Sequence, residues 1–172
     1  MKHLILGGVR SGKSRYAEQQ AGASGKAVVY FATAQARDAE MARRIAWHRR
    51  QRPAHWLLVE EPLALADALE KHASPEHCLL VDCLTLWLSN LLHAGEERLQ
   101  RERQALLDCL PRLPGEVLLV TNEVGQGIVP MGELNRRFCD EAGRLHQALA
   151  ARCERVTWMI AGLPQCVKGE AV

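Results

Sequence analysis

The residues with the clearest chemical role lie near the start of the chain, in the run Gly7-Gly8-Val9-Arg10-Ser11-Gly12-Lys13-Ser14. This run fits the pattern G-x-x-x-x-G-K-[ST], in which main-chain N–H groups surround the phosphates of a nucleoside triphosphate. Glycines adopt the backbone dihedrals that turn these N–H groups inward. An accidental glycine turn is the alternative, but an apolar run precedes this motif and a helical pattern follows it. We therefore predict a triphosphate site, with Lys13 as a catalytic residue on the phosphates and Ser14 as a ligand of Mg²⁺.

Asp82 is a second candidate for the same site, because it ends the apolar run Leu79-Leu80-Val81. In P-loop proteins a carboxylate at the end of such a strand holds Mg²⁺, directly or through water. The alternative is that Asp82 caps the following helix, and the two roles are compatible. Cys83 follows, where many ATPases place a glutamate that activates water. Its identity favours transfer of a phosphoryl group to a bound acceptor over hydrolysis.

Other polar residues also follow apolar runs, at the points where we predict buried strands to end. These are Ala32-Thr33-Ala34-Gln35 and Asn122-Glu123. Ligands of open parallel sheets bind beyond the carboxyl ends of the strands, so these segments should surround one crevice with the phosphate loop. Asn122, Glu123 and residues 125–127 could meet an acceptor or the metal, or could form a turn that positions the next helix. Glu60 and Glu61 could accept hydrogen bonds from a base or a ribose, or could be solvated.

A charged segment over residues 40–53 holds one histidine, His48, among five arginines. Runs of charge are usually solvated faces of helices. The segment is therefore compatible both with an amphipathic helix and with a site for phosphate groups. The chain's other histidines His3, His72, His77, His93 and His146 show no paired spacing, and we predict that they are surface or structural residues. His55 lies beside Pro53 and Trp56, a pattern that favours the packed start of a strand.

The elements that must position these residues alternate between short apolar runs and longer amphipathic stretches. We predict strands over residues 3–6, 27–31, 56–59, 78–81, 116–121 and 155–161, and helices over residues 13–21, 37–50, 63–72, 85–92, 97–110 and 133–151. Alternating strands and helices imply a parallel sheet. The expected fold class is α/β, a P-loop NTPase of the RecA-like type with a mostly parallel central sheet and helices on both faces. A length of 172 residues suits a single domain over the whole chain.

The composition narrows the class of protein. The formal net charge is +2 and 24% of the residues are charged, which argues against a dedicated nucleic-acid-binding protein and fits an anionic small-molecule substrate. No apolar run reaches the ~18 residues of a membrane helix, and the run at residues 4–6 is too short for a signal peptide. The six cysteines form no C-x-x-C pair, so we expect no zinc site, reduced thiols and a cytoplasmic protein.

Several segments together carry a more specific signal than the phosphate loop. They occur in the order Gly7–Ser14, Arg44-Ile45 followed by His48, Arg52-Pro53-Ala54-His55-Trp56, Val81-Asp82-Cys83-Leu84-Thr85 and Thr121-Asn122-Glu123-Val124-Gly125-Gln126-Gly127-Ile128-Val129-Pro130. This set resembles the family of bifunctional adenosylcobinamide kinases / adenosylcobinamide-phosphate guanylyltransferases of cobalamin biosynthesis. The resemblance covers residues 4–168, which is nearly the whole chain.

The resemblance implies two reactions on a corrinoid substrate, with GTP and ATP as nucleotides and Mg²⁺ as the metal. A triphosphate phosphorylates the aminopropanol hydroxyl of adenosylcobinamide, and GTP then gives its GMP group to that phosphate through a histidine adduct. The position of the motifs assigns this histidine to His48. The resemblance also implies a homo-oligomer, a trimer in this family, and nucleotide contacts that extend beyond the loop. Those contacts are Ala32, Thr33, Ala34, Arg49, Arg50, Gln51, Arg52, Glu60 and Asp82.

The chemistry of His48 is consistent with this role. A neutral imidazole has the lone pair that attacks an α-phosphorus, and neighbouring arginines disfavour the imidazolium form. The same guanidinium groups can stabilise the departing pyrophosphate. His55 is the rival nucleophile. His48 lies far along a predicted helix and not at a strand end, so this helix either projects across the crevice or moves when GTP binds. Our hypothesis is that it swings toward the phosphate loop.

Two other functions fit the phosphate loop without the resemblance. One is a kinase of another small alcohol, and the other is a nucleotide-switch module with slow hydrolysis. A GMP group bound covalently to the protein is expected for the bifunctional enzyme and for neither of these two alternatives.

Overall fold

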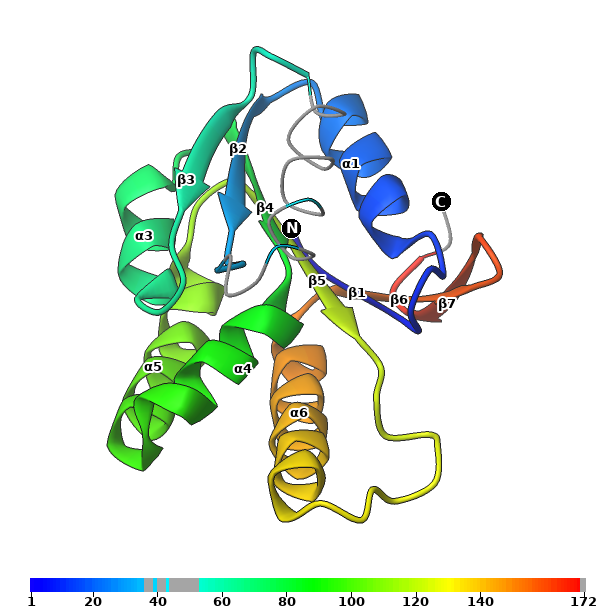
Figure 1. The fold of residues 1–172 in the computed structure, drawn as a ribbon. Helices are drawn as coiled ribbons and strands as arrows, with labels where there is room; N and C mark the ends of the chain where they lie inside the picture. Colours follow the sequence, from blue (N-terminus) through cyan, green and yellow to red (C-terminus); the bar gives the residue numbers. More distant parts are fainter. Residues whose placement is uncertain (36–38, 40–42, 44–52, 171–172) are drawn as a thin grey trace.

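The computed structural model describes residues 1–35, 39, 43 and 53–170 (Figure 1). Its sheet has seven strands in the order β3-β2-β4-β5-β1-β6-β7. The strands are β1 (Lys2–Gly7), β2 (Ala27–Ala32), β3 (Leu57–Glu60), β4 (His77–Asp82), β5 (Glu116–Asn122), β6 (Arg155–Ile160) and β7 (Leu163–Lys168). The pairs among β1 to β6 are parallel, so the predicted mostly parallel sheet is confirmed.

The strand β7 was not predicted, and it pairs antiparallel with β6 at the edge of the sheet. Ile160 pairs with Leu163 across the turn Ala161-Gly162, in which both residues have positive φ (51° and 83°). Such turns match the twist of a hairpin and favour glycine at the second position. The residues of β7 are almost all exposed, so the strand lacks the buried alternation that marks a strand in sequence. The predicted strand over 155–161 accordingly ends one residue early, at Ile160.

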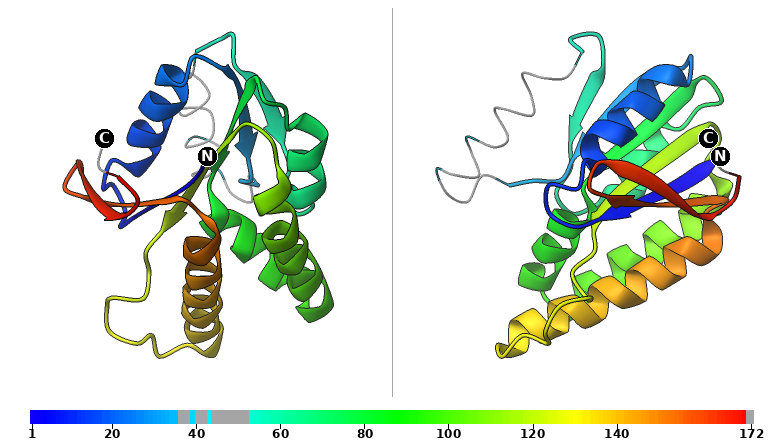
Figure 2. Two further views of the ribbon diagram at one scale, coloured as in Figure 1. Left: turned by 180° about the vertical axis from the view of Figure 1, so that it is seen from behind. Right: turned by 90° about the vertical axis from the view of Figure 1, so that its right-hand side faces the viewer.

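Helices cover both faces of the sheet, as predicted. α1 (Lys13–Ala23) lies on one side, and α4 (Leu84–Ala94), α5 (Glu96–Cys109) and α6 (Glu133–Arg152) lie on the other (Figure 2). α3 (Leu65–His72) packs in the same apolar cluster as α4, α5 and α6, and a short 3₁₀ turn (Leu110–Arg112) follows α5. The helix predicted over residues 37–50 lies outside the described residues.

Strand alternation divides the core into two apolar layers. In β4, Leu79 and Val81 join the cluster under α3 to α6, while Cys78 and Leu80 join the cluster under α1. All four side chains are fully buried. Burying one such leucine contributes about 1.5–3 kcal/mol, so a strand buried on both faces is anchored strongly. This anchoring fixes where β4 ends, at Asp82.

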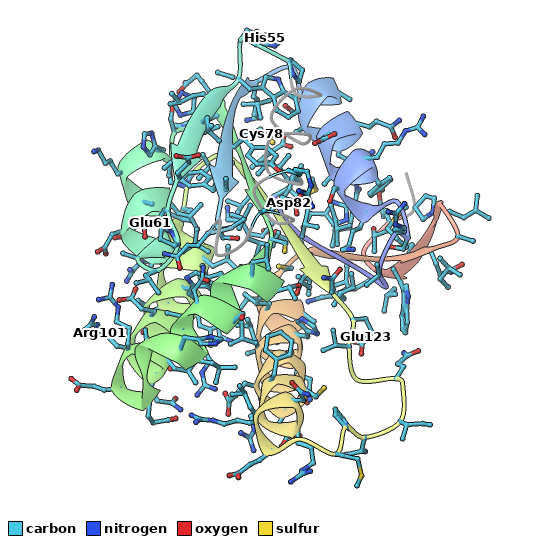
Figure 3. The ribbon with its side chains drawn as sticks, viewed as in Figure 1. His55, Glu61, Cys78, Asp82, Arg101 and Glu123 are labelled. Carbon is cyan, nitrogen blue, oxygen red and sulfur yellow. The ribbon has the colours of Figure 1, made fainter. Side chains whose placement is uncertain are left out.

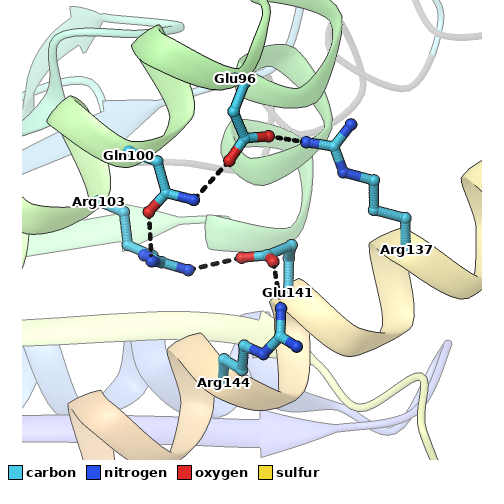
Figure 4. A network of polar contacts seen from close by, with 6 residues as sticks. All are labelled: Glu96, Gln100, Arg103, Arg137, Glu141 and Arg144. Atoms are coloured by element: carbon cyan, nitrogen blue, oxygen red, sulfur yellow. Dashed lines mark hydrogen bonds and ion pairs between the residues drawn. The ribbon is translucent and has the colours of Figure 1, made fainter.

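Polar contacts fasten α6 to α5 beyond the sheet (Figure 4). The buried carboxylate of Glu141 accepts hydrogen bonds from Arg103 Nη1 at 2.5 Å and from Arg144 Nη1 at 2.6 Å. Arg137 at the start of α6 pairs with Glu96 at the start of α5. A buried carboxylate that lost its cation would be costly, so these contacts hold α6 at one position along α5.

The six cysteines are free, and four of them are buried. Burial raises the pKa of Cys83, beside Asp82, to about 11, which makes its thiol a poor nucleophile. In the described part of the chain, no helix combines the length and the apolar character that crossing a bilayer requires.

One buried histidine should make the stability of the fold depend on pH. His3 has no exposed surface, its Nε2 lies 2.8 Å from Thr157 Oγ1, and burial, with a smaller contribution from Arg155, lowers its pKa to about 4. The unfolded chain, with a histidine pKa of 6.5, therefore binds this proton at a higher pH than the folded chain does. Stability from His3 is present above pH 6.5 and is lost as pH falls toward 4, by about 2 kcal/mol at pH 5.

We expect urea unfolding at pH 7.5 and pH 5 to show this loss in the wild type and a smaller one in His3→Gln. The exposed His93 provides the control, because His93→Gln should keep the wild-type difference. Equal differences for wild type and His3→Gln would contradict the assignment.

Candidate functional site

The sheet brings the predicted site segments to one edge, where the parallel strands end. Gly7 pairs with Asn122, and Ala32 pairs with Glu60 on one side and Asp82 on the other. The phosphate-loop strand β1 and the Asp82 strand β4 are both neighbours of β5. The end of β5 therefore stands between the two elements that we expect to hold a nucleotide and its metal.

Main-chain hydrogen bonds hold the phosphate loop from two sides. The N–H of Glu123, after β5, donates to the carbonyl of Gly7 at 3.0 Å, and the N–H of Gly162, in the β6–β7 turn, donates to that of Ser11 at 3.0 Å. Between them Val9 and Arg10 are exposed. α1 begins at Lys13 after Gly12, and no side chain caps its first N–H groups. Uncapped N–H groups at the start of a helix favour an anion, so the geometry suits a phosphate.

Lys13 extends back over this loop. Its Nζ donates to the carbonyl of Gly8 at 3.0 Å. Burial lowers the pKa of Lys13, while the nearby carboxylate of Asp82 opposes that shift. The ammonium group and the carboxylate therefore lie close enough to interact, which is the relation expected of the residues that neutralise a triphosphate and bind its metal.

Asp82 does not cap the following helix, so that alternative is wrong. α4 begins at Leu84 after Cys83, and no side chain caps its first turn. Asp82 continues the alternation of Cys78 and Leu80, whose side chains pack under α1. Its carboxylate is thus on the face of the sheet that carries the phosphate loop. Figure 3 labels Asp82 near the middle of the molecule.

Thr33 has a structural role that the sequence analysis did not predict. Its side chain is fully buried, its Oγ1 donates to the carbonyl of Cys83 at 2.6 Å, and the N–H of Cys83 donates to it at 3.2 Å. The carbonyl of Thr33 accepts from Asn90 Nδ2 at 2.8 Å. Thr33 therefore ties the end of β2 to the start of α4. Contacts of this segment with a nucleotide would come from Ala32 and Ala34, which are partly exposed.

The two glutamates after β3 separate in the structure. Glu60 is exposed at the end of the strand, level with Ala32 at the carboxyl edge. Glu61 is engaged, because its Oε1 accepts hydrogen bonds from the N–H groups of Leu63 and Ala64, each at 2.8 Å. Glu60 therefore lies at the edge of the sheet that also carries the phosphate loop.

His146 on α6 is a polar neighbour of the site that we did not predict. Its Nδ1 lies 3.9 Å from Glu123 Oε2, and its Nε2 lies 2.9 Å from Thr121 Oγ1. It was predicted to be a surface or structural residue. Its spacing to the buried residues Ala142 and Leu149, which share the 3.6-residue period, is the signal that could have placed it on the face toward the sheet.

The arginine-rich segment with His48, Arg49, Arg50, Gln51 and Arg52 lies outside the described residues. The rival nucleophile His55 is described, and it is exposed just before β3. Because β3 is parallel to β2, His55 belongs to the amino-terminal edge of the sheet, opposite the phosphate loop. Figure 3 shows it at the far end of the molecule from Glu123. This position disfavours His55 as a group that attacks a bound triphosphate.

A cleft of about 490 Å³ lies elsewhere, between the first turns of α5 and α6. Three arginines and four carboxylates line it, together with Gln100. Its arginines are engaged: Arg137 with Glu96, Arg144 with Glu141, and Arg136 with the carbonyls of residues 130 and 131. The cleft therefore offers an anion much less free positive charge than the phosphate loop does.

The phosphate loop makes a steric prediction. A Cβ at Gly7 would lie 2.3 Å from Ser11 Oγ and 3.0 Å from the main-chain oxygen of Met159, whereas a Cβ at Gly8 would meet nothing within 4 Å. We expect Gly7→Ala to lower the free energy of unfolding by about 1–3 kcal/mol, because the clash must displace β6 or the loop. Gly8→Ala is the matched control and should change it little. Equal unfolding free energies for the two variants, measured in urea, would contradict the loop geometry.

Comparison with known proteins identifies the family of this chain. The family model described as cobinamide kinase / cobinamide phosphate guanyltransferase matches residues 3–167. The bifunctional adenosylcobalamin biosynthesis protein CobP of Pseudomonas aeruginosa is 64% identical over 171 residues, which cover 99% of both chains. The bifunctional adenosylcobalamin biosynthesis protein CobU of Escherichia coli is 41% identical, over 98% of this chain and 100% of that protein.

Solved structures agree on the fold. A RadB recombinase superposes with a TM-score of 0.51 at 20% identity, covering 91% of this chain and 73% of that one. A protein from Pyrococcus horikoshii OT3 superposes with a TM-score of 0.58 at 7% identity, covering 99% and 87%. The predicted P-loop NTPase fold is thereby confirmed. The family match and the two relatives also confirm the resemblance seen in the sequence, so this chain belongs to the cobinamide kinase / cobinamide phosphate guanyltransferase family of transferases.

Proposed function

We propose that this protein catalyses both reactions of its family on a corrinoid: phosphorylation of the aminopropanol hydroxyl of adenosylcobinamide, then transfer of GMP from GTP to the new phosphate. The observation that carries the proposal is the phosphate loop at the end of β1, where Lys13 interacts with the charge of Asp82. Strand β5 lies between β1 and the Asp82 strand β4. Family membership supplies the identity of the acceptor. GTP serves as the guanylyl donor, and ATP or GTP as the phosphoryl donor.

The triphosphate lies over residues 7–14 in this proposal. Main-chain N–H groups of the loop and of the first turn of α1 bind its phosphates, and Lys13 leaves the carbonyl of Gly8 to contact the β- and γ-phosphates. Ala32, Ala34 and Glu60 border the same edge and contact the base and ribose. Thr33 supports these residues from within the core.

Mg²⁺ would be held by Ser14 and Asp82. Among the described residues no group of three His, Cys, Asp or Glu side chains could bind a metal ion. The hydroxyl of Ser14 and the carboxylate of Asp82 fit Mg²⁺, which is usually held by one or two protein oxygens together with substrate phosphates and waters. When bound, the ion neutralises charge that develops between the β- and γ-phosphates.

His48 carries GMP between the two substrates in this proposal. The imidazole attacks the α-phosphorus of GTP, pyrophosphate leaves, and the phosphate of the corrinoid then attacks the same phosphorus and frees the histidine. Arg49, Arg50, Gln51 and Arg52 bind the phosphates during the exchange. The support for His48 is its place in the family's motif order, together with the position of His55 at the opposite edge of the sheet.

Incubation with α-labelled GTP tests this function directly. The wild type should acquire an acid-labile label that survives denaturation, and His48→Ala should lose at least about 99% of it, because a covalent step has no substitute nucleophile. His55→Ala is the matched control and should keep the label. A label that persists in His48→Ala and disappears in His55→Ala would overturn the assignment of the nucleophile.

We further propose that residues 1–172 form one catalytic domain, that the protein is cytoplasmic, and that it assembles as a homotrimer. The continuous seven-stranded sheet supports the first, and the six free cysteines support the second. The loop after β5 supports assembly, since Ile128 and Met131 are 98% and 95% exposed and a second copy would cover them.

Sedimentation equilibrium at micromolar concentration measures this assembly. The expected mass is that of three chains, and Met131→Glu should shift it toward one chain, because a charge would enter an apolar contact. A wild type that sediments as a single chain would contradict the trimer.

A further inference from the structure

The end of β5 places an acidic side chain beside the phosphate loop that the roles assigned so far leave unused. β5 continues for two residues beyond Val120, which pairs with Asp82, and so reaches about 7 Å further along the strand than Asp82 does. The next residue, Glu123, is joined through its N–H to the carbonyl of Gly7, where the loop begins. The main chain of Glu123 is therefore fixed beside the start of the phosphate loop.

The carboxylate of Glu123 is held at one oxygen and remains partly accessible. Oε1 accepts a hydrogen bond from the N–H of Gly125, and Oε2 faces Nδ1 of His146 at 3.9 Å. The side chain keeps 24% of its surface exposed. One oxygen is thus occupied, while Oε2 has room for a donor from a substrate.

A chain of hydroxyl groups determines how His146 faces Glu123. Thr85 Oγ1 accepts the N–H of Asn122 at 2.7 Å and lies 3.4 Å from Thr121 Oγ1, which lies 2.9 Å from His146 Nε2. Burial lowers the pKa of His146, with Glu123 opposing that shift, and this favours the neutral ring. A lone pair on Nδ1 would face the carboxylate and repel it. The ring therefore carries its hydrogen on Nδ1 and accepts from Thr121 at Nε2.

The position of His146 along α6 is itself fixed. Glu141, on the same helix, is buried and bound by Arg103 and Arg144, and Arg137 pairs with Glu96 of α5 (Figure 4). These contacts prevent α6 from sliding along α5. His146 consequently has a fixed position beside the Glu123 carboxylate.

We propose that Glu123 is the catalytic residue that takes the proton of the acceptor hydroxyl in the kinase step, and that His146 is a positioning residue that holds it there. The hydroxyl proton moves to Oε2 of Glu123 while the hydroxyl oxygen forms a bond to the γ-phosphorus. The bond from that phosphorus to the β–γ bridging oxygen breaks, and the nucleoside diphosphate leaves with the electron pair. The inference rests on the proposed kinase function.

Neighbouring residues are less suited to this task. Asp82 lies under α1 close to Lys13, where its negative charge is needed on the metal side of the phosphates. Asn122 has a buried Oδ1 that lacks a hydrogen-bond partner in the described structure. An amide oxygen does not take up a proton at neutral pH, so Asn122 cannot deprotonate the hydroxyl.

Glu123→Gln tests the catalytic part. Gln keeps the acceptor for the N–H of Gly125 and removes the base. With adenosylcobinamide and γ-labelled GTP, kcat for label reaching the corrinoid should fall about 100-fold or more, with KM for GTP within about twofold. Labelling of the protein by α-labelled GTP should stay near wild type, because forming the GMP adduct requires no hydroxyl to lose a proton.

The result that overturns the proposal is a kcat within about threefold of wild type, or a parallel loss of the GMP label, which would mean that Glu123 serves nucleotide binding or the fold. Failure of the proposed function looks different, because then the wild type itself would transfer no γ-label to the corrinoid. The two failures are thus distinguishable in the same experiment.

A pair of His146 variants tests the positioning part. His146→Asn keeps an N–H close to the place of Nδ1, whereas His146→Leu removes it. We expect kcat to fall about tenfold or more in His146→Leu and to be largely restored in His146→Asn, with unchanged KM for GTP and unchanged GMP label. Equal kcat values for the two variants, or an equal loss of the GMP label, would overturn the role of His146.

Discussion

The pairing of β5 between β1 and β4 is the constraint on which the rest of the site depends. Parallel pairing sets the register, so that Gly7 lies level with Asn122 while Asp82 ends two residues lower. The first peptide groups after the strands then complete the pattern, because the N–H of Glu123 bonds to Gly7. The phosphate loop is therefore positioned by main-chain hydrogen bonds from two sides.

The alternation of side chains in parallel strands gives the two faces of the sheet different tasks. Asp82 lies on the face of α1, where Lys13 interacts with its charge. Thr121 lies on the opposite face, where His146 of α6 reaches its hydroxyl. Glu123 directly follows the end of β5, at the edge where the two faces of the sheet meet. The adjacent strands β4 and β5 thus present a charged group on one face of the sheet and a polar contact with α6 on the other.

The sequence predicted the parts of this structure that local pattern controls. The phosphate loop is contiguous, and Asp82 follows an apolar run typical of a strand buried on both faces, so the sequence alone could place both. Other features depend on contacts between distant residues. The bonds of Thr33 to Cys83 and of His146 to Thr121 arise when the sheet forms, and local spacing does not reveal these partners, although the helical period could have placed His146 on the face toward the sheet. β7 was not predicted, because an exposed edge strand lacks the alternation of buried and exposed residues that marks a strand in sequence. The segment with His48 lies outside the described residues, so its role rests on motif order.

The most direct test of the account is a structure of the protein with Mg²⁺ and the α,β-methylene analogue of GTP, which cannot release pyrophosphate. The account predicts the phosphates on the main-chain N–H groups of residues 8–14, Lys13 Nζ moved from Gly8 to the β- and γ-phosphates, and Asp82 on the side of the metal. A triphosphate bound in the cleft between α5 and α6, with the phosphate loop empty, would contradict it.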